Sequence, residues 1–202
     1  MTTETGIRRP GPPDDALIAV DVQNDFVPGG RLAVPDGGAV IAPLNAWLGA
    51  FASAGCMTLA SRDWHPPDHC SFVARGGPWP AHCVAGSDGA AFATGLALPA
   101  RCRVVDKGTR ADEEAYSAFS GTGLAATLAA AGVRRLWVGG LATDYCVAAT
   151  VHDALEHGFE VVVLIDAVRG VDVAHGDSAR ALAAMRAAGA TLFAGSPPEQ
   201  RH

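Results

Sequence analysis

The feature that most constrains the fold is a regular alternation of short apolar segments with longer segments of helical periodicity. Apolar runs such as ALIAVDV (16–22) and EVVVLID (160–166) are typical of strands buried on both faces. Such an alternation predicts an α/β fold, a single-domain three-layer sandwich with a mainly parallel, roughly six-stranded sheet and helices on both faces. The expected strands are 16–22, 56–61, 102–108, 134–140, 160–166 and 190–195, and the expected helices are 40–55, 122–132, 143–158 and 177–189.

The predicted domain spans residues 16–195 of the 202-residue chain. Residues 1–15, which carry charges and prolines, are expected to form a flexible leader, and residues 196–202 a short tail. The alternation is interrupted at 62–101, a segment rich in Gly, Pro, His and Trp without periodicity. A loop of that length in a compact domain usually has a functional reason.

Composition excludes several classes of protein. A formal net charge of -6 without a basic block argues against nucleic acid as a partner. No stretch approaches the roughly 20 apolar residues of a membrane helix, and the first residues lack the apolar core of a signal peptide. We therefore expect a cytoplasmic protein, monomeric or homo-oligomeric, with no membrane partner. Its odd number of cysteines, without a CxxC pair, predicts free thiols at Cys56, Cys70, Cys83, Cys102 and Cys146.

Ionisable residues follow several of the predicted strands. Asp21 closes the first strand, Lys107 closes the third, and Cys146 follows the fourth. Ligands of open parallel sheets bind at the carboxyl ends of the strands, where these side chains would meet. A thiol, a carboxylate and an ammonium at one edge would supply a nucleophile, its base and a stabilising charge. The alternative for Cys146 is a buried structural role, which we assign to the other four cysteines.

The setting of Cys146 favours the catalytic interpretation. Thr143 is the expected N-cap of helix 143–158, which would place Cys146 in the first helical turn. The free backbone N–H groups and the helix dipole would there lower the pKa of the thiol. The small residues GGLA at 139–142 would let a carbonyl substrate approach the backbone, where N–H groups could form an oxyanion hole.

The loop that follows the second strand carries residues typical of a metal site. Asp63, His65, His69 and His82 lie within 22 residues, RDWHPPDHCSFVARGGPWPAHC. Two imidazoles and a carboxylate suit a divalent transition ion such as zinc, iron or manganese. In an extended segment the D-x-H spacing puts Asp63 and His65 on one face. Histidines and aspartates are also common in loops without a metal, so the residues alone leave both interpretations open.

Taken together, five segments resemble the bacterial nicotinamidases of the isochorismatase-like cysteine hydrolase superfamily. The D-x-Q-N-D-F and A-T-D-x-C motifs mark the superfamily, whereas D-W-H and G-G-P-W-P-x-H-C are similar to nicotinamidases in particular. The resemblance covers about residues 16–195, in order. Its segments are ALIAVDVQNDFVPGG, SRDWHPPDHCSF, GGPWPAHC, DKGTRADEEAYSAFSGTGL and GGLATDYCVAATVHDALEHGFEVVVLIDAVRG.

The resemblance implies roles for individual residues. Asp21, Lys107 and Cys146 match the catalytic aspartate, lysine and nucleophile. The implied ligands of one divalent ion, zinc with iron or manganese as alternatives, are Asp63, His65 and His82, with His69 left open as a fourth. The implied oxyanion hole is formed by Ala142 and Cys146, and the implied substrate contacts are Phe26, Trp79, Tyr116, Leu141 and Ala142. The peptide bond between Leu141 and Ala142 is cis in similar proteins.

The implied activity is metal-dependent hydrolysis of nicotinamide to nicotinate and ammonia through a cysteine thioester. It would serve NAD salvage, and pyrazinamide, a nicotinamide analogue, would be a second substrate.

Several other functions are compatible with parts of the sequence. A related amidohydrolase acting on a carbamoyl group would share Asp21, Lys107 and Cys146 but would not need the metal loop. An isochorismatase-type ether hydrolase has no need for a cysteine nucleophile. A metal-binding or redox module would leave Asp21 and Lys107 unexplained and lacks a CxxC pair. A nucleotide-binding domain lacks a G-x-G-x-x-G or P-loop segment after its first strand.

Overall fold

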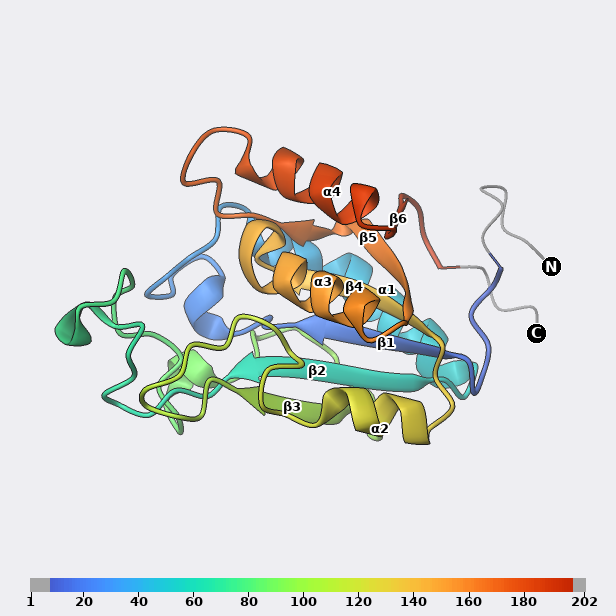
Figure 1. The fold of residues 1–202 in the computed structure, drawn as a ribbon, viewed down its shortest axis with the longest axis horizontal. Helices are drawn as coiled ribbons and strands as arrows, with labels where there is room; N and C mark the ends of the chain where they lie inside the picture. Colours follow the sequence, from blue (N-terminus) through green and yellow to red (C-terminus); the bar gives the residue numbers. More distant parts are fainter. Residues whose placement is uncertain (1–7, 198–202) are drawn as a thin grey trace.

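The computed structural model describes residues 8–197 and shows one all-parallel sheet of six strands with helices on both faces (Figure 1). This confirms the predicted α/β architecture. The strands are β1 Asp15–Val20, β2 Met57–Asp63, β3 Arg103–Lys107, β4 Arg135–Leu141, β5 Glu160–Arg169 and β6 Thr191–Phe193. The α-helices are α1 Ile41–Ser53, α2 Leu124–Ala130, α3 Ala148–Glu156 and α4 Asp177–Ala187. Within residues 8–197, no helix has the length and apolar character needed to cross a bilayer.

The strand order, β3-β2-β1-β4-β5-β6, places the first and fourth strands together at the centre of the sheet. The first three strands are added from the centre of the sheet toward one edge. The chain then returns to the centre, and β4 to β6 are added toward the other edge. Such a reversal opens a crevice at the carboxyl ends of the two central strands, which is where ligands of open α/β sheets bind. In this chain the crevice lies between Asp21, directly after β1, and the segment from Ala142 to Cys146 after β4.

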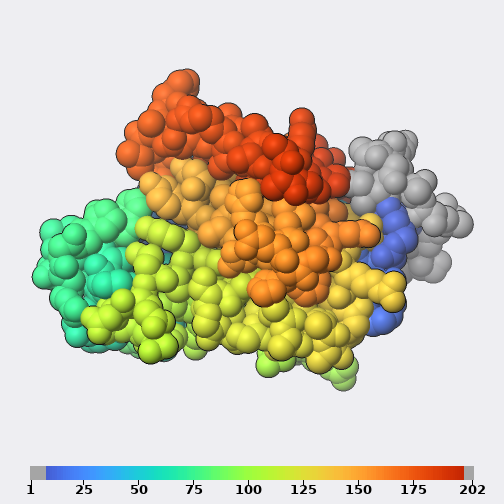
Figure 2. All heavy atoms as spheres, in the orientation of Figure 1, coloured from blue at the N-terminus to red at the C-terminus, as the bar shows by residue number. Residues whose placement is uncertain are grey.

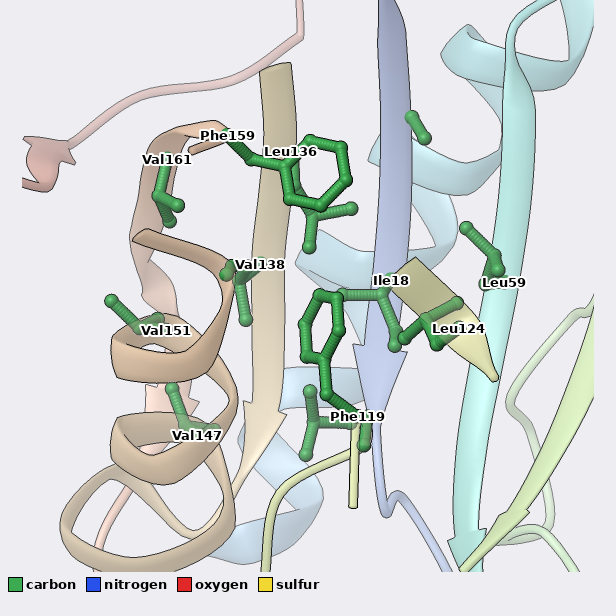
Figure 3. Packing of buried hydrophobic residues seen from close by; sticks show 14 of the residues in the cluster. Ile18, Leu59, Phe119, Leu124, Leu136, Val138, Val147, Val151, Phe159 and Val161 are labelled. Carbon is green, nitrogen blue, oxygen red and sulfur yellow. The ribbon is translucent and has the colours of Figure 1, made fainter. Parts of the chain in front are cut away.

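Each face of the sheet has its own hydrophobic core. Helix α1 packs on one face, where Trp47 and Phe51 contact Trp137 of β4 through their rings. Helices α2, α3 and α4 cover the other face. Figure 3 shows this second core, in which Val147 and Val151 point toward Val138 of β4. Because both faces are covered, the central strands β1 and β4 are buried along their whole length, as the sequence pattern indicates.

The amino ends of the central strands are joined by a buried ion pair. Arg135 Nε lies 2.6 Å from Asp15 Oδ1, which also accepts a hydrogen bond from Trp137 Nε1. Arg8 and Gly11 of the expected leader donate hydrogen bonds to the other oxygen of Asp15. Residues 8–14 are therefore held against this end of the sheet. The rest of the leader, residues 1–7, and residues 198–202 of the tail lie outside the described residues.

The loops at the opposite end of the sheet carry only short 3₁₀ turns, as the absence of periodicity in 62–101 predicts. The segments near residues 70–80 and 105–120 lie side by side at the left end of the molecule (Figure 2). Arg75 pairs with Asp112 at 2.7 Å, and Cys70 N donates to Ala111 O. These contacts close the loops over the carboxyl ends of β2 and β3.

One expected helix begins differently from the prediction. The segment 143–158 divides into a π-helical turn, Thr143–Val147, and then α3. The prediction of Thr143 as N-cap is wrong, because Ala142 occupies that position and no side chain caps the turn. Instead, Ala142 O accepts from both Tyr145 N and Val147 N, so the backbone itself closes the turn.

Glycine is required at the junction of the two central strands. Gly140 has φ +127°, and a Cβ there would lie 2.1 Å from Val20 O in the paired strand. We expect Gly140→Ala to lower the free energy of unfolding by about 3 kcal/mol, because it strains the backbone and forces β1 from β4. Urea denaturation measures the loss.

Gly49 provides the control for this experiment. It lies on the exposed side of helix α1 with nothing within 4 Å of its Cβ position. Gly49→Ala should raise stability by about 0.5–1 kcal/mol, because alanine has the higher helix propensity. Equal effects of the two substitutions would contradict the assignment of strain to Gly140.

Candidate active site

Three strand ends deliver an ammonium, a carboxylate and a thiol to the central crevice. Lys107 closes β3, Asp21 follows β1, and Cys146 lies in the turn after β4. Lys107 Nζ lies 2.9 Å from Asp21 Oδ2 and 3.5 Å from Cys146 Sγ. The same ammonium pairs with Asp63 Oδ1. The structure thus brings together the three residues that the sequence places at different strand ends.

The two oxygens of the Asp21 carboxylate differ in their contacts: Oδ1 accepts a hydrogen bond and Oδ2 does not. Its backbone has φ 49°, which turns the chain sharply at the end of β1. Ser61 Oγ donates a 2.7 Å hydrogen bond to Oδ1, while Ser61 O accepts one from Asp21 N. Oδ2 contacts the ammonium of Lys107 as an ion pair but accepts no well-directed hydrogen bond. A buried oxygen with a free lone pair is suited to accept a proton.

Burial and the neighbouring charges shift the pKa values of Asp21, Asp63 and Lys107. Desolvation raises the pKa of the Asp21 carboxyl above its ordinary value, although Lys107 opposes the rise. Burial alone would also raise the pKa of Asp63, but the neighbouring Lys107 and His65 bring it below its usual range. For Lys107 burial favours the neutral amine, yet the two carboxylates raise its pKa well above the ordinary value. The lysine is therefore a fixed positive charge between two carboxylates.

The expected lowering of the pKa of the Cys146 thiol is wrong. Burial raises this pKa well above the ordinary value, and Asp21 and Asp63 add to the rise while Lys107 opposes it. The effect of the turn's N–H groups is outweighed because the sulfur is buried beside two carboxylates. The resting thiol is therefore protonated, and it needs a base in order to act as a nucleophile.

A carboxylate and two imidazoles form a second group beside the first. Ligand atoms of Asp63, His65 and His82 all lie within 4.8 Å of one another, and all three residues are buried. His65 Nδ1 is hydrogen-bonded to Gly108 O and His82 Nδ1 to Pro80 O, and both rings present Nε2 toward Asp63 Oδ2.

Backbone partners of this kind fix the orientation of metal-binding histidines. The donor set, one carboxylate oxygen and two imidazole nitrogens, fits a divalent transition ion.

His69, the residue left open as a fourth ligand, lies outside this group. Its ring stacks on that of His65 with centroids 4.0 Å apart. Nδ1 is hydrogen-bonded to Ser71 Oγ and Nε2 to Glu113 O. Because both ring nitrogens already have partners, His69 supports the position of His65 and offers no nitrogen to an ion.

Aromatic side chains surround the cavity in front of these groups. Phe26, Trp79, Tyr116 and Ala142 line it together with Cys146, as expected. The Trp79 Nε1 group donates a 3.0 Å hydrogen bond to Tyr116 Oη, so the two rings are fixed relative to each other. A flat ring can be held between such side chains.

The expected contact from Leu141 is not found. Leu141 is fully buried in the core on the α1 face and does not line the cavity, because the end of β4 directs its side chain away. The peptide bond between Leu141 and Ala142 is cis, as the resemblance implies.

Sequence reasoning missed several residues of the cavity wall. Tyr145 packs edge-on against Trp79 at 5.2 Å, and its place beside Cys146 in the same turn could have indicated it. The others come from loops with no local signal. They are Leu32, Val34, Ser71, Glu114, Ala115 and Val171.

Comparison with known proteins identifies the family. The Isochorismatase domain matches residues 15–195. The chain belongs to the isochorismatase family. It is 41% identical over 202 residues to "Nicotinamidase" of Escherichia coli (strain K12), a match that covers 90% of this chain and 95% of that protein.

Two solved structures of the isochorismatase family are similar over nearly the whole chain. The pyrazinamidase of Pyrococcus horikoshii in complex with zinc has a TM-score of 0.87 and 47% identity, covering 91% of this chain and 100% of that one. PnC1 from L. infantum in complex with nicotinate has a TM-score of 0.81 and 39% identity, covering 90% and 92%. This isochorismatase-family protein is a hydrolase that acts on an amide.

The isochorismatase-family site depends on Lys107 for its stability. Lys107→Met would leave Asp21 and Asp63 buried without their cation. We expect the free energy of unfolding to fall by about 3–5 kcal/mol, the usual cost of breaking a buried ion pair. The control is Arg110→Met, which removes an exposed pair with Glu113 and should cost under about 1 kcal/mol. Urea denaturation at neutral pH compares the two variants.

The loss in free energy of unfolding caused by Lys107→Met should become smaller as the pH falls. Without the ammonium, the folded-state pKa values of Asp21 and Asp63 rise above those of the unfolded chain. The folded state then binds more protons than the unfolded state, so its stability increases as pH falls. A deficit that stays constant between pH 8 and pH 5 would contradict the pairing.

Proposed function

We propose that this chain hydrolyses nicotinamide to nicotinate and ammonia through a thioester on Cys146, with pyrazinamide as a second substrate and NAD salvage as its role. The single observation that carries the proposal is the contact of Lys107 Nζ with both Asp21 and Cys146, directly behind an aromatic cavity that Cys146 lines. The nicotinate bound to the L. infantum protein and the name of the E. coli relative support the substrate.

The cavity fits a small, flat, neutral heteroaromatic amide. Phe26, Trp79 and Tyr116 supply apolar faces for the ring. Asp63, His65 and His82 would hold a divalent ion, with zinc favoured by the P. horikoshii structure. When bound, the ion supplies a Lewis-acid site for the ring nitrogen. The carboxamide, attached at the ring carbon meta to that nitrogen, would face Cys146.

Asp21 acts as the base and then as the acid. Its Oδ2 takes the proton of the Cys146 thiol as the sulfur forms a bond with the amide carbon. The carbon–nitrogen bond breaks as Asp21 returns this proton to the leaving nitrogen, which departs as ammonia. Water then adds to the thioester, giving up a proton to Asp21. As the carbon–sulfur bond breaks, Asp21 returns this proton to the sulfur and the thiol is restored. The product acid ionises to nicotinate by giving its proton to ammonia, so atoms and charges balance over the cycle.

Lys107 and the backbone stabilise the charged species. The fixed ammonium of Lys107 lies beside both the sulfur and the carboxylate, so it favours the thiolate as the proton leaves. The N–H groups of Ala142 and Cys146 would donate to the oxyanion of the tetrahedral intermediate, and each such donor commonly contributes about 3 kcal/mol.

A carbamoyl amide is the second candidate substrate, since Asp21, Lys107 and Cys146 alone could attack it. The buried Asp63, His65 and His82 group favours nicotinamide, because a carbamoyl substrate has no ring nitrogen to place there. Ammonia release by the zinc-loaded protein from nicotinamide, pyrazinamide and N-carbamoylglycine decides between them. Preference for the carbamoyl compound would overturn the proposal.

Replacement of the nucleophile should abolish turnover. We expect Cys146→Ala to lower kcat for nicotinamide at least about a thousandfold with the thermal midpoint of unfolding little changed. Cys102→Ala, at a half-buried thiol before β3, should stay within about twofold of wild type. The rate of ammonia release measures both. Residual activity of Cys146→Ala above a tenth of wild type would remove the nucleophile assignment.

Loss of one ligand should release the ion. We expect His65→Ala to lower bound zinc, measured by elemental analysis, from about one ion per chain to less than a tenth, because two ligands bind weakly. His69→Ala should retain at least half of the zinc, because neither ring nitrogen of His69 is free to coordinate. Equal loss from the two variants would contradict the assignment of His69 to a supporting role outside the ligand group.

A further inference from the structure

The side chain of Gln23 makes a set of hydrogen bonds that the proposed chemistry does not use. Gln23 is fully buried three residues beyond the end of β1. Its Nε2 group donates to Asp63 O at 2.8 Å and to Ala90 O at 3.0 Å, and its Oε1 accepts from Asp63 N at 2.8 Å. Both N–H donors and the carbonyl oxygen of the amide therefore have partners inside the protein.

This amide continues the sheet where β1 has ended. β1 and β2 pair in register from Ala16 with Met57 to Ala19 with Ala60, and then β1 turns away at Asp21. The N–H and C=O of Asp63 that face β1 would be left buried without a strand beside them. A donor and an acceptor on one planar amide replace the backbone of that missing strand.

Asp63 is the residue whose position matters most to the site. One oxygen of its carboxylate pairs with Lys107, and the other lies 3.5 Å from His65 Nε2 and 4.0 Å from His82 Nε2. The direction of the carboxylate is set by the backbone that carries it. A backbone shift at Asp63 would therefore move a metal ligand and the partner of the ammonium at once.

We infer that Gln23 is a positioning residue of the metal centre, in that its amide fixes the backbone of Asp63 and thereby the carboxylate that would bind the ion. The inference rests on the metal site of the proposed function. It requires no contact of Gln23 with substrate or ion, and Gln23 is absent from the cavity wall.

The test is the affinity of the full chain for zinc, measured by competition with a chromogenic chelator. Gln23→Met keeps the length of the side chain and removes all three hydrogen bonds. Gln23→Glu keeps the size and the acceptor for Asp63 N, but sets a carboxylate against Asp63 O and Ala90 O. We expect zinc binding to weaken about 10–100-fold for Gln23→Met and about tenfold for Gln23→Glu, in the range found for outer-shell partners of metal ligands.

The neighbouring residue provides a matched control. Asn24 donates one hydrogen bond from its side chain to Asp88 O and touches none of the three ligands. Asn24→Ala should bind zinc within about twofold of wild type. Circular dichroism of the zinc-free proteins identifies variants that fold, and Gln23→Glu keeps the test decisive if Gln23→Met is unfolded.

Each outcome bears on one assignment. A folded Gln23 variant that binds zinc within twofold of wild type, even with a lowered thermal midpoint, would show a merely structural role and overturn the inference. Wild type that binds zinc but does not hydrolyse nicotinamide would overturn the proposed substrate and leave the role of Gln23 standing. Wild type that binds no zinc would overturn this inference, while ammonia release reports separately on the hydrolysis.

Discussion

The structure is organised around one buried ammonium between two buried carboxylates. Lys107 contacts Asp21 on the side of Cys146 and Asp63 on the side of His65 and His82. Two carboxylates this close could not both remain charged away from water without a cation between them. The strands β1, β2 and β3 each end at one member of this trio. The three buried charges compensate one another only when the ends of these parallel strands are aligned in the sheet.

The same arrangement explains why Cys146 rests as a thiol. Burial raises the pKa of the Cys146 thiol well above its ordinary value, so the sulfur holds no stable negative charge in the absence of substrate, whereas the ion pair with Lys107 opposes the rise in the pKa of Asp21. The free lone pair of Asp21 Oδ2 gives the thiol proton a destination close at hand. A thiol that ionises only as a bond forms is protected from chance oxidation and alkylation, since the thiolate is the reactive form.

Much of this could be predicted from the sequence. The strands and helices follow from apolar runs and helical periodicity, and Asp21, Lys107 and Cys146 meet because all three follow strand ends. The sequence could not show that burial would outweigh the helix turn at Cys146, since desolvation depends on the packed loops. The orientation of Leu141 and the engagement of His69 with Ser71 and Glu113 likewise depend on tertiary contacts. Spacing along a loop does not fix which imidazole nitrogens remain free.

The reversal of strand order at the centre of the sheet divides the chemistry between two stretches of chain. Residues 8–132 carry Asp21, Lys107 and the Asp63 group, whereas residues 133–197 carry Cys146. Severing the backbone at Gly132 would give one fragment with Asp21 and Lys107 but without Cys146, and another with Cys146 but without Asp21 or Lys107. Each would be chemically silent by itself, and hydrolysis would return only with docking along the β1–β4 seam. The two fragments would therefore behave as a split reporter, in which formation of product indicates that they have associated.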